Sequence, residues 1–208
     1  MSALSQAVQD YLEMRRAMFK ASRRMMLLFA TSLAVAGLAA ASAQAAVLHV
    51  NGERTAITPN AQSIAFFSAF GITVTPTGPA TGGSDGSLIL PITHGWVTTE
   101  GPPMAKIYHA GGVTFSTAGR SLNFRDFVLV HKADRAWLKA KLNDRGWVIF
   151  AWLTSANVTY LGNEGTVTGE LKLSEQAAKA FNWLVGENVS VPGAEIAKMK
   201  STVRVVSG

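Results

Sequence analysis

The chain has 208 residues, of which 48% are hydrophobic and only 15% are charged, and its net charge is +6. This balance fits one globular domain, or at most two small ones, and excludes a charged disordered tail or a coiled coil, which need more charged residues. The sequence contains no cysteine, which excludes a disulfide framework, a thiolate metal site and a cysteine nucleophile.

The first 45 residues predict an export signal. Arg23 and Arg24 precede an apolar run over 25–40, which leads to the small-residue motif 43–45, Ala-Gln-Ala. This layout is typical of a secretory signal peptide, with cleavage before Ala46. An uncleaved membrane helix is the alternative, but the run of about 16 residues is shorter than the roughly 20 that span a bilayer.

Residues 1–17 precede this signal as an extension, and we interpret Met18 as the true start because it leaves a basic region of ordinary length. The mature chain, 46–208, is then a single exported domain. We expect it to be secreted or associated with the cell envelope, with no transmembrane span after cleavage.

The mature chain is predicted to form short strands separated by turns. Turns recur about every 8 to 15 residues, which favours an all-β fold, a sandwich or barrel of antiparallel sheets, over alternating βαβ units. The predicted strands are 86–91, 104–109, 112–117, 121–131, 136–143, 147–155 and 165–173.

The segment 147–153 is apolar at almost every position. Trp147 and Trp152 lie an odd number of residues apart, so they project from opposite faces of a regular strand. We therefore predict a central strand buried between two layers; a strand with one face that meets a partner is the alternative. On this interpretation Trp152→Ala should cost about 3 to 5 kcal/mol.

Two segments, 57–67 and 173–183, predict short helices and resemble each other at a constant offset. Thr58 followed by Pro59, and Ser174 followed by Glu175, are recognisable helix starts. Each helix leads into a predicted extended segment, 72–76 or 189–192. We interpret the pair as helical plugs that cover open ends or edges of the β core; chance similarity is the alternative.

The charged residues of the mature chain show neither a nucleic-acid site nor an enzyme. Lys139 and Lys141 alternate along one face of a predicted strand, as on a solvated face. Asp126 interrupts an apolar strand, which a β-bulge or an ion pair with one of these lysines would accommodate. Ser121 and His109 complete the residue types of a triad, but no motif positions the serine as a nucleophile.

Short motifs of the mature chain resemble a known family. They are L-I-L-P-I-T-H-G at 88–95, I-Y-H-A-G-G-V-T-F at 107–115, G-R-S-L at 119–122 and V-T-G at 167–169. They are similar to secreted bacterial domains of the HtaA type, in which an "fP-t-G" strand leads into a hairpin carrying "H-x-G-G-l-x-f". The resemblance covers residues 55–206, approximately the whole mature chain.

The resemblance implies that the domain binds haem, because characterised domains of the HtaA type bind haem at the bacterial surface through a tyrosine and a nearby histidine. His109 matches the histidine of the hairpin motif. The family's tyrosine lies in an aromatic helix near the start of its domain, where this chain has Phe66, Phe67 and Phe70.

Other residues are candidate ligands beside His109. Tyr108 is its neighbour on a predicted strand, so only one of the two can face a pocket. His94 and His131 also have the chemistry of axial ligands. The alternative for each histidine is a hydrogen-bonded or solvated position. The candidate ligand-binding residues are therefore His109, Tyr108 and His94, with no metal site of the protein's own.

The sequence thus predicts a non-catalytic binding or structural module. Its expected partner is a component of the cell envelope or a hydrophobic small molecule, and not a nucleic acid. The alternative function is binding of haem or another hydrophobic ligand through the HtaA-like hairpin.

Overall fold

The computed structural model describes residues 47–98, 104–143 and 145–206, which are mostly β-strand with two helices. The strands that form the main body are β1 (Val47–Pro59), β4 (Leu88–Thr98), β5 (Met104–His109), β7 (Ser121–Lys132), β8 (Arg135–Leu142), β9 (Trp147–Leu161), β10 (Glu164–Leu173) and β11 (Glu195–Val206). They pair antiparallel in the order β7-β5-β4-β1-β11-β10-β9-β8, and β8 pairs again with β7. The eight strands therefore close into a barrel, which confirms the all-β prediction in its barrel form rather than as a sandwich.

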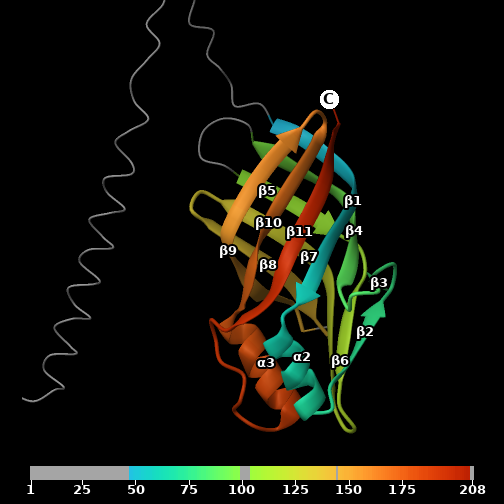
Figure 1. The fold of residues 1–208 in the computed structure, drawn as a ribbon, viewed down its shortest axis with the longest axis vertical. Helices are drawn as coiled ribbons and strands as arrows, with labels where there is room; N and C mark the ends of the chain where they lie inside the picture. Colours follow the sequence, from blue (N-terminus) through green and yellow to red (C-terminus); the bar gives the residue numbers. More distant parts are fainter. Residues whose placement is uncertain (1–46, 99–103, 144, 207–208) are drawn as a thin grey trace, which may run out of the picture. The chain divides into compact units, whose positions relative to one another are not determined.

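The remaining elements extend the barrel at one end (Figure 1). The strands β6 (Gly112–Ser116) and β2 (Thr73–Thr77) continue the sheet beyond β7, and the short β3 (Thr81–Gly82) pairs with β4. The helices α2 (Ala61–Ala69) and α3 (Glu175–Val185) lie side by side across that end (Figure 1). Their contact includes the rings of Phe67 and Phe181, whose centroids are 6.5 Å apart.

The helix starts were predicted correctly for α3 and wrongly for α2. Ser174 caps α3 and accepts a hydrogen bond from the amide of Ala177 at 3.0 Å. The cap of α2 is Asn60, whose side chain accepts from the amide of Ser63 at 2.8 Å. Thr58 and Pro59 do not begin the helix, because both still pair with β11 as the end of β1.

The two helices differ in how tightly they pack. Five residues of α3 are buried, and they share one face of the helix: Ala177, Ala178, Ala180, Phe181 and Leu184. In α2 the one buried residue is Ser63, while Ile64 is 53% exposed. Helix α3 is thus part of the core, and α2 is a looser cover over the barrel end.

Residues 189–192 were predicted to be extended, but they form part of the loop between α3 and β11. The strand begins later, at Glu195, and pairs with β1 from Pro59 opposite Ala197 to His49 opposite Val206. Neither β1 nor β11 was predicted as a full-length strand, although together they form a side of the barrel.

The prediction of β9 as a strand buried on both faces is wrong, because a β-bulge changes its alternation. Ala151 pairs with Leu138 and Ile149 with Lys139, so Phe150 is an extra residue with no partner on β8. The extra residue places Trp147 and Trp152 on the same outer face, where they are 46% and 37% exposed. The predicted cost of Trp152→Ala, which assumed full burial, is therefore too large.

The prediction for Asp126 is confirmed. Both a β-bulge and an ion pair with a lysine accommodate its charge in the strand. The β7–β8 register shifts between Arg125 and Val128, and Asp126 has the positive φ of 56° that such a bulge permits. Its carboxylate lies 2.9 Å from the Nζ atom of Lys141. The charged pair sits at the barrel surface, outside the apolar core.

The two glycines of the HtaA-like hairpin motif allow close backbone packing. A Cβ atom at Gly112 would lie 2.1 Å from the carbonyl oxygen of Phe124 on β7. Gly111 has a φ of 80°, and a Cβ there would lie 2.5 Å from the amide nitrogen of Ala80. The motif therefore allows β6 to pair closely with β7 and lets the chain before β6 pass close to Ala80.

The predicted signal peptide, its cleavage before Ala46 and the start at Met18 all fall on residues outside the described ranges, so they remain predictions. Within the described ranges, no helix is both long and apolar enough to cross a membrane.

Candidate functional site: a phenylalanine-lined cavity

The phenylalanines of the described residues form one continuous cluster at the helix-covered end of the barrel. Ring contacts with centroid separations of 4.9 to 6.5 Å link all eight of them: Phe66, Phe67, Phe70, Phe115, Phe124, Phe127, Phe150 and Phe181. Most pairs meet at tilted or edge-to-face angles, the geometries that aromatic rings prefer.

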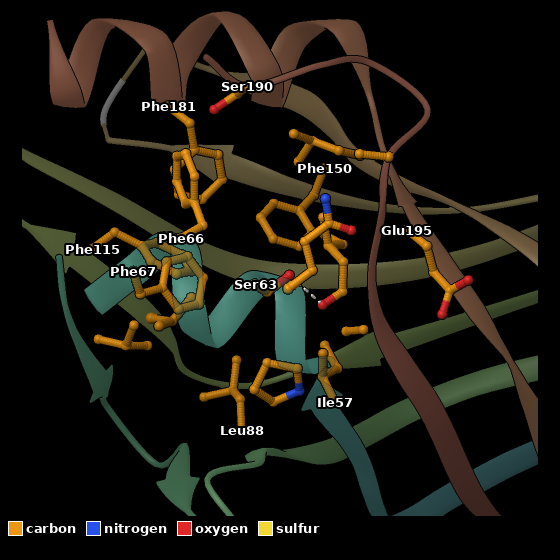
Figure 2. A pocket seen from close by; sticks show the side chains of 18 of the residues that line it. Ile57, Ser63, Phe66, Phe67, Leu88, Phe115, Phe150, Phe181, Ser190 and Glu195 are labelled. Atoms are coloured by element: carbon orange, nitrogen blue, oxygen red, sulfur yellow. Dashed lines mark hydrogen bonds between the residues drawn. The ribbon is translucent and has the colours of Figure 1, made fainter. Parts of the chain in front are cut away.

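A cavity of about 250 Å³ lies between these rings, the two helices and the barrel end. Figure 2 shows Phe66 and Phe67 of α2, Phe181 of α3 and the strand residues Phe115 and Phe150 gathered around it. Val189 and Val191, 36% and 64% exposed, line it from the loop after α3.

Few polar groups line this cavity. The hydroxyl of Ser63 donates to the carbonyl oxygen of Ile196 at 2.7 Å, so it is already engaged. Among the lining residues Glu195 is the one that carries a formal charge, and it is partly exposed. The interior therefore offers apolar contact and very little hydrogen bonding, which suits an uncharged hydrophobic molecule.

His109 lies beneath this end of the barrel, buried in a small polar layer. Its Nδ1 atom is 3.0 Å from the carbonyl oxygen of Phe127, and its Nε2 atom is 2.7 Å from the hydroxyl of Thr55. That hydroxyl lies 2.8 Å from the hydroxyl of Ser201, which pairs with Thr55 across β1 and β11. All three side chains are less than 5% exposed.

These hydrogen bonds define the state of the imidazole. Burial lowers the pKa of His109 from 6.5 to about 4, so the ring is neutral at pH 7. A carbonyl oxygen can only accept, so Nδ1 carries the hydrogen and donates to Phe127. Nε2 is then an acceptor and receives the hydrogen of Thr55. Both ring nitrogens are engaged within the protein.

The polar layer is next to the cavity but separate from it. Ile57, two residues after Thr55 on the inner face of β1, lines the cavity, as does Ala197, four residues before Ser201 on β11. Phe127 joins the two, since its side chain lines the cavity and its carbonyl oxygen binds His109.

Tyr108 and His94 lie together, away from His109. The two residues pair across β5 and β4, and their rings stack with centroids 4.4 Å apart and an interplanar angle of 12°. His94 is exposed, and both side chains are on the outer face of the barrel. The structure thus brings two of the three candidate ligand residues together and places the third inside the barrel.

The lining residues supply no haem ligand. None of those described is histidine, tyrosine or methionine. His109 uses both nitrogens in hydrogen bonds, and Tyr108 and His94 face away from the barrel interior. Within the described ranges, no group of three or more histidine, aspartate or glutamate side chains is placed to hold a metal ion.

Sequence reasoning did not find the cavity or the partners of His109. Thr55 and Ser201 stand at inward positions of β1 and β11, and their signal is a hydroxyl residue in an otherwise apolar alternation. The phenylalanines come from five different elements or their ends, so no local pattern links them. Their placement depends on closure of the barrel.

The sequence matches no family model and no curated protein. Solved structures do match it. The C-terminal domain of HtaA from Corynebacterium glutamicum superposes with a TM-score of 0.61 and 13% identity, over 76% of this chain and 99% of that domain. The N-terminal domain of the same protein gives a TM-score of 0.52 and 12% identity, over 76% of this chain and 99% of that domain.

Each of these domains is matched almost over its whole length. At such low identity the likeness concerns the fold. The chain therefore contains a domain with the HtaA-type fold.

Proposed function

We propose that this domain is a non-catalytic binding module that holds a small apolar molecule in the cavity beneath α2 and α3. The observation that carries the proposal is the cavity itself, about 250 Å³ in volume and lined by six phenylalanines. An engineered apolar cavity of about 150 Å³ takes up benzene. A molecule of about two fused rings, or a short alkyl chain, is therefore the size that this site suits.

The loose packing of α2 supports the same proposal. Phe66 and Phe67 line the cavity but are only partly buried, although they belong to the aromatic cluster. A ligand in the cavity would cover more of both rings and so stabilise α2 against the barrel. Helix α3, with five buried residues, needs no ligand for its packing.

Haem is the alternative that the sequence resemblance implies, with His109 at the matching position of the hairpin. The residues present do not fit ligation of haem iron in the cavity, because no lining residue is an axial ligand and His109 is fully hydrogen-bonded. We therefore favour a metal-free ligand. The predicted export signal supports a function outside the cytoplasm, as a secreted or envelope-associated binder.

The test uses N-phenyl-1-naphthylamine, an uncharged two-ring dye with an attached phenyl group, whose fluorescence rises in an apolar site. We expect saturable binding to the wild-type chain and a loss of affinity of about tenfold or more in Phe66→Ala, equivalent to about 1.4 kcal/mol. The matched control is Phe70→Ala, which changes a partly buried phenylalanine of the same cluster that does not line the cavity. Equal losses in both variants would contradict the proposal.

A comparison of haem with iron-free protoporphyrin IX separates the alternatives. If apolar contact is what the site offers, the two porphyrins should displace the dye equally or not at all. Tighter binding of haem, with a Soret band that His109→Ala removes and His94→Ala leaves, would favour iron ligation. The melting temperature of each variant shows whether it is folded.

A further inference from the structure

The outer face of the barrel carries a second aromatic region, here called the tryptophan wall. It comprises outward side chains of β4, β5, β8 and β9, namely Trp96, Lys106, Tyr108, Trp137, Lys139, Lys141, Trp147 and Trp152. None of them lines the cavity. Aromatic and basic side chains are combined here, whereas the cavity is lined by apolar ones.

Strand pairing makes these residues one continuous surface. Trp96 pairs with Lys106, Lys106 with Val130, Val130 with Trp137, and Trp137 with Trp152. A parallel row runs through His94, Tyr108, Val128, Lys139 and Ile149. Val128, in this second row, is 1% exposed and lies outside the main buried cluster.

The lysines of the wall lie over its aromatic rings. The Nζ atom of Lys106 is 4.9 Å from the ring centroid of Tyr108. Lys139 and Lys141 lie 4.6 and 5.4 Å from the ring of Trp147. Trp137 and Trp152 meet edge to face at 6.0 Å. The rings are thus held in place and still partly exposed, and each cationic head lies at the surface.

Basic side chains that are far apart in the sequence lie close together at or beside the wall. Lys172 pairs with Trp152 at one edge, and Lys132 and Arg135 pair at the β7–β8 turn, where Asp134 also lies. Asp126 of β7, which lies beside the wall, forms an ion pair with Lys141. On the outer faces of β10 and β11, Glu170 pairs with Lys198, Glu164 with Arg204 and Thr168 with Lys200, so two of the three basic side chains of β11 face a carboxylate.

We propose that the tryptophan wall binds the surface of an anionic lipid bilayer. Tryptophan and tyrosine rings favour the boundary between headgroups and acyl chains, where one side of the ring is apolar and the polar tip stays wet. Lysine side chains near an anionic surface add electrostatic attraction that salt screens. The wall is the outside of a barrel and carries none of the described cavity, so it suits an extended surface better than a small molecule.

Vesicle sedimentation tests this with the full chain. One set of vesicles is phosphatidylcholine alone, and in the other about a third of the lipid is phosphatidylglycerol. We expect the chain to bind the anionic vesicles more tightly than the phosphatidylcholine vesicles, and we expect salt to weaken this binding. The double variant K106E/K139E should bind the anionic vesicles about tenfold more weakly than the wild-type chain. The matched control is K198E/K200E, with the same charge change on the opposite side of the barrel. Because all variants share residues 1–46, a difference in vesicle affinity between them arises from the substituted barrel surface.

Brominated phosphatidylcholine in the anionic vesicles gives a second readout, because bromine quenches tryptophans that reach the bilayer. Quenching should fall in W147A/W152A and persist in Trp183→Ala, which removes an exposed tryptophan of α3. Equal losses in both double lysine variants, or equal quenching in all tryptophan variants, would overturn the proposal. So would binding to dextran sulfate without binding to vesicles. Phe66→Ala should bind vesicles normally, because the cavity is a separate site.

Discussion

Two regions of this domain are rich in aromatic residues, and they use different rings. Every described phenylalanine belongs to the cluster at the helix-covered end, where no lysine or arginine lines the cavity. All five tryptophans of the chain lie at the surface, partly or largely exposed, and two of them contact basic groups. Phenylalanine has no polar atom to satisfy, whereas the indole N–H of tryptophan favours a position near water. Aromatic content alone therefore does not identify a binding site, and the neighbouring charges define what each region can hold.

The comparison predicts that the phenylalanine cluster, and not the tryptophan wall, stabilises the fold. Phe124 is fully buried, contacts the rings of Phe115, Phe150 and Phe181, and does not line the cavity. Phe124→Ala should lower the free energy of unfolding by about 3 to 5 kcal/mol, as measured by chemical denaturation. A loss below about 1 kcal/mol would mean that this cluster is not the core.

The polar layer beneath the cavity adds a dependence on pH. The pKa of His109 is lowered to about 4, whereas an unfolded histidine keeps the ordinary value of 6.5. Between these values the unfolded chain binds a proton that the folded chain does not. The free energy of unfolding should therefore fall as the pH drops from about 6.5 to about 4, by on the order of 3 kcal/mol, and this contribution is complete below about 4.

Denaturation at several pH values measures this effect. His94→Asn, which changes an exposed histidine of the outer face, should keep the same pH dependence. His109→Gln should remove the fall in the free energy of unfolding between about pH 6.5 and pH 4. If His94→Asn removed this fall instead, the buried ring of His109 would not be the cause of the pH dependence.

The barrel was predictable from sequence to the extent that its signals are local. The turns and the alternation of apolar residues located most strands, and the Ser174-Glu175 pair located the start of α3. The start of α2 was misplaced because Thr58 and Pro59 remain in the sheet, a tertiary effect that overrides the local helix signal. The cavity was not predictable, because its phenylalanines come together only when strands distant in sequence close the barrel.

The sequence pattern did not indicate the bulge at Phe150, although this one extra residue reverses which side chains of β9 face the solvent. Trp152 is 37% exposed and rests against Trp137. Trp152→Ala should therefore lower the free energy of unfolding by about 1 to 2 kcal/mol, well below the 3 to 5 kcal/mol of a buried aromatic residue. Thermal unfolding of this variant beside Phe124→Ala gives the ranking directly. Similar losses in both would show that the wall is part of the core.

The smallest expected effect concerns a residue that links the two regions. The hydroxyl of Ser174 accepts from the amide of Ala177 in α3 and donates to the carbonyl oxygen of Ile149 in β9. Helix α3 brings Phe181 to the cluster, and β9 carries Trp147 and Trp152 of the wall.

Ser174→Ala should cost about 1 kcal/mol, the usual value for a lost helix cap, and Thr202→Ala, at a half-buried outer position of β11, should cost less. Because the hydroxyl joins α3 to β9, we also expect Ser174→Ala to weaken dye binding in the cavity slightly while leaving vesicle binding unchanged. That result would mean that the strand holds the helix in place for the cavity, and that the wall does not depend on the helix. Equal losses of stability in Ser174→Ala and Thr202→Ala would argue against this role of the cap.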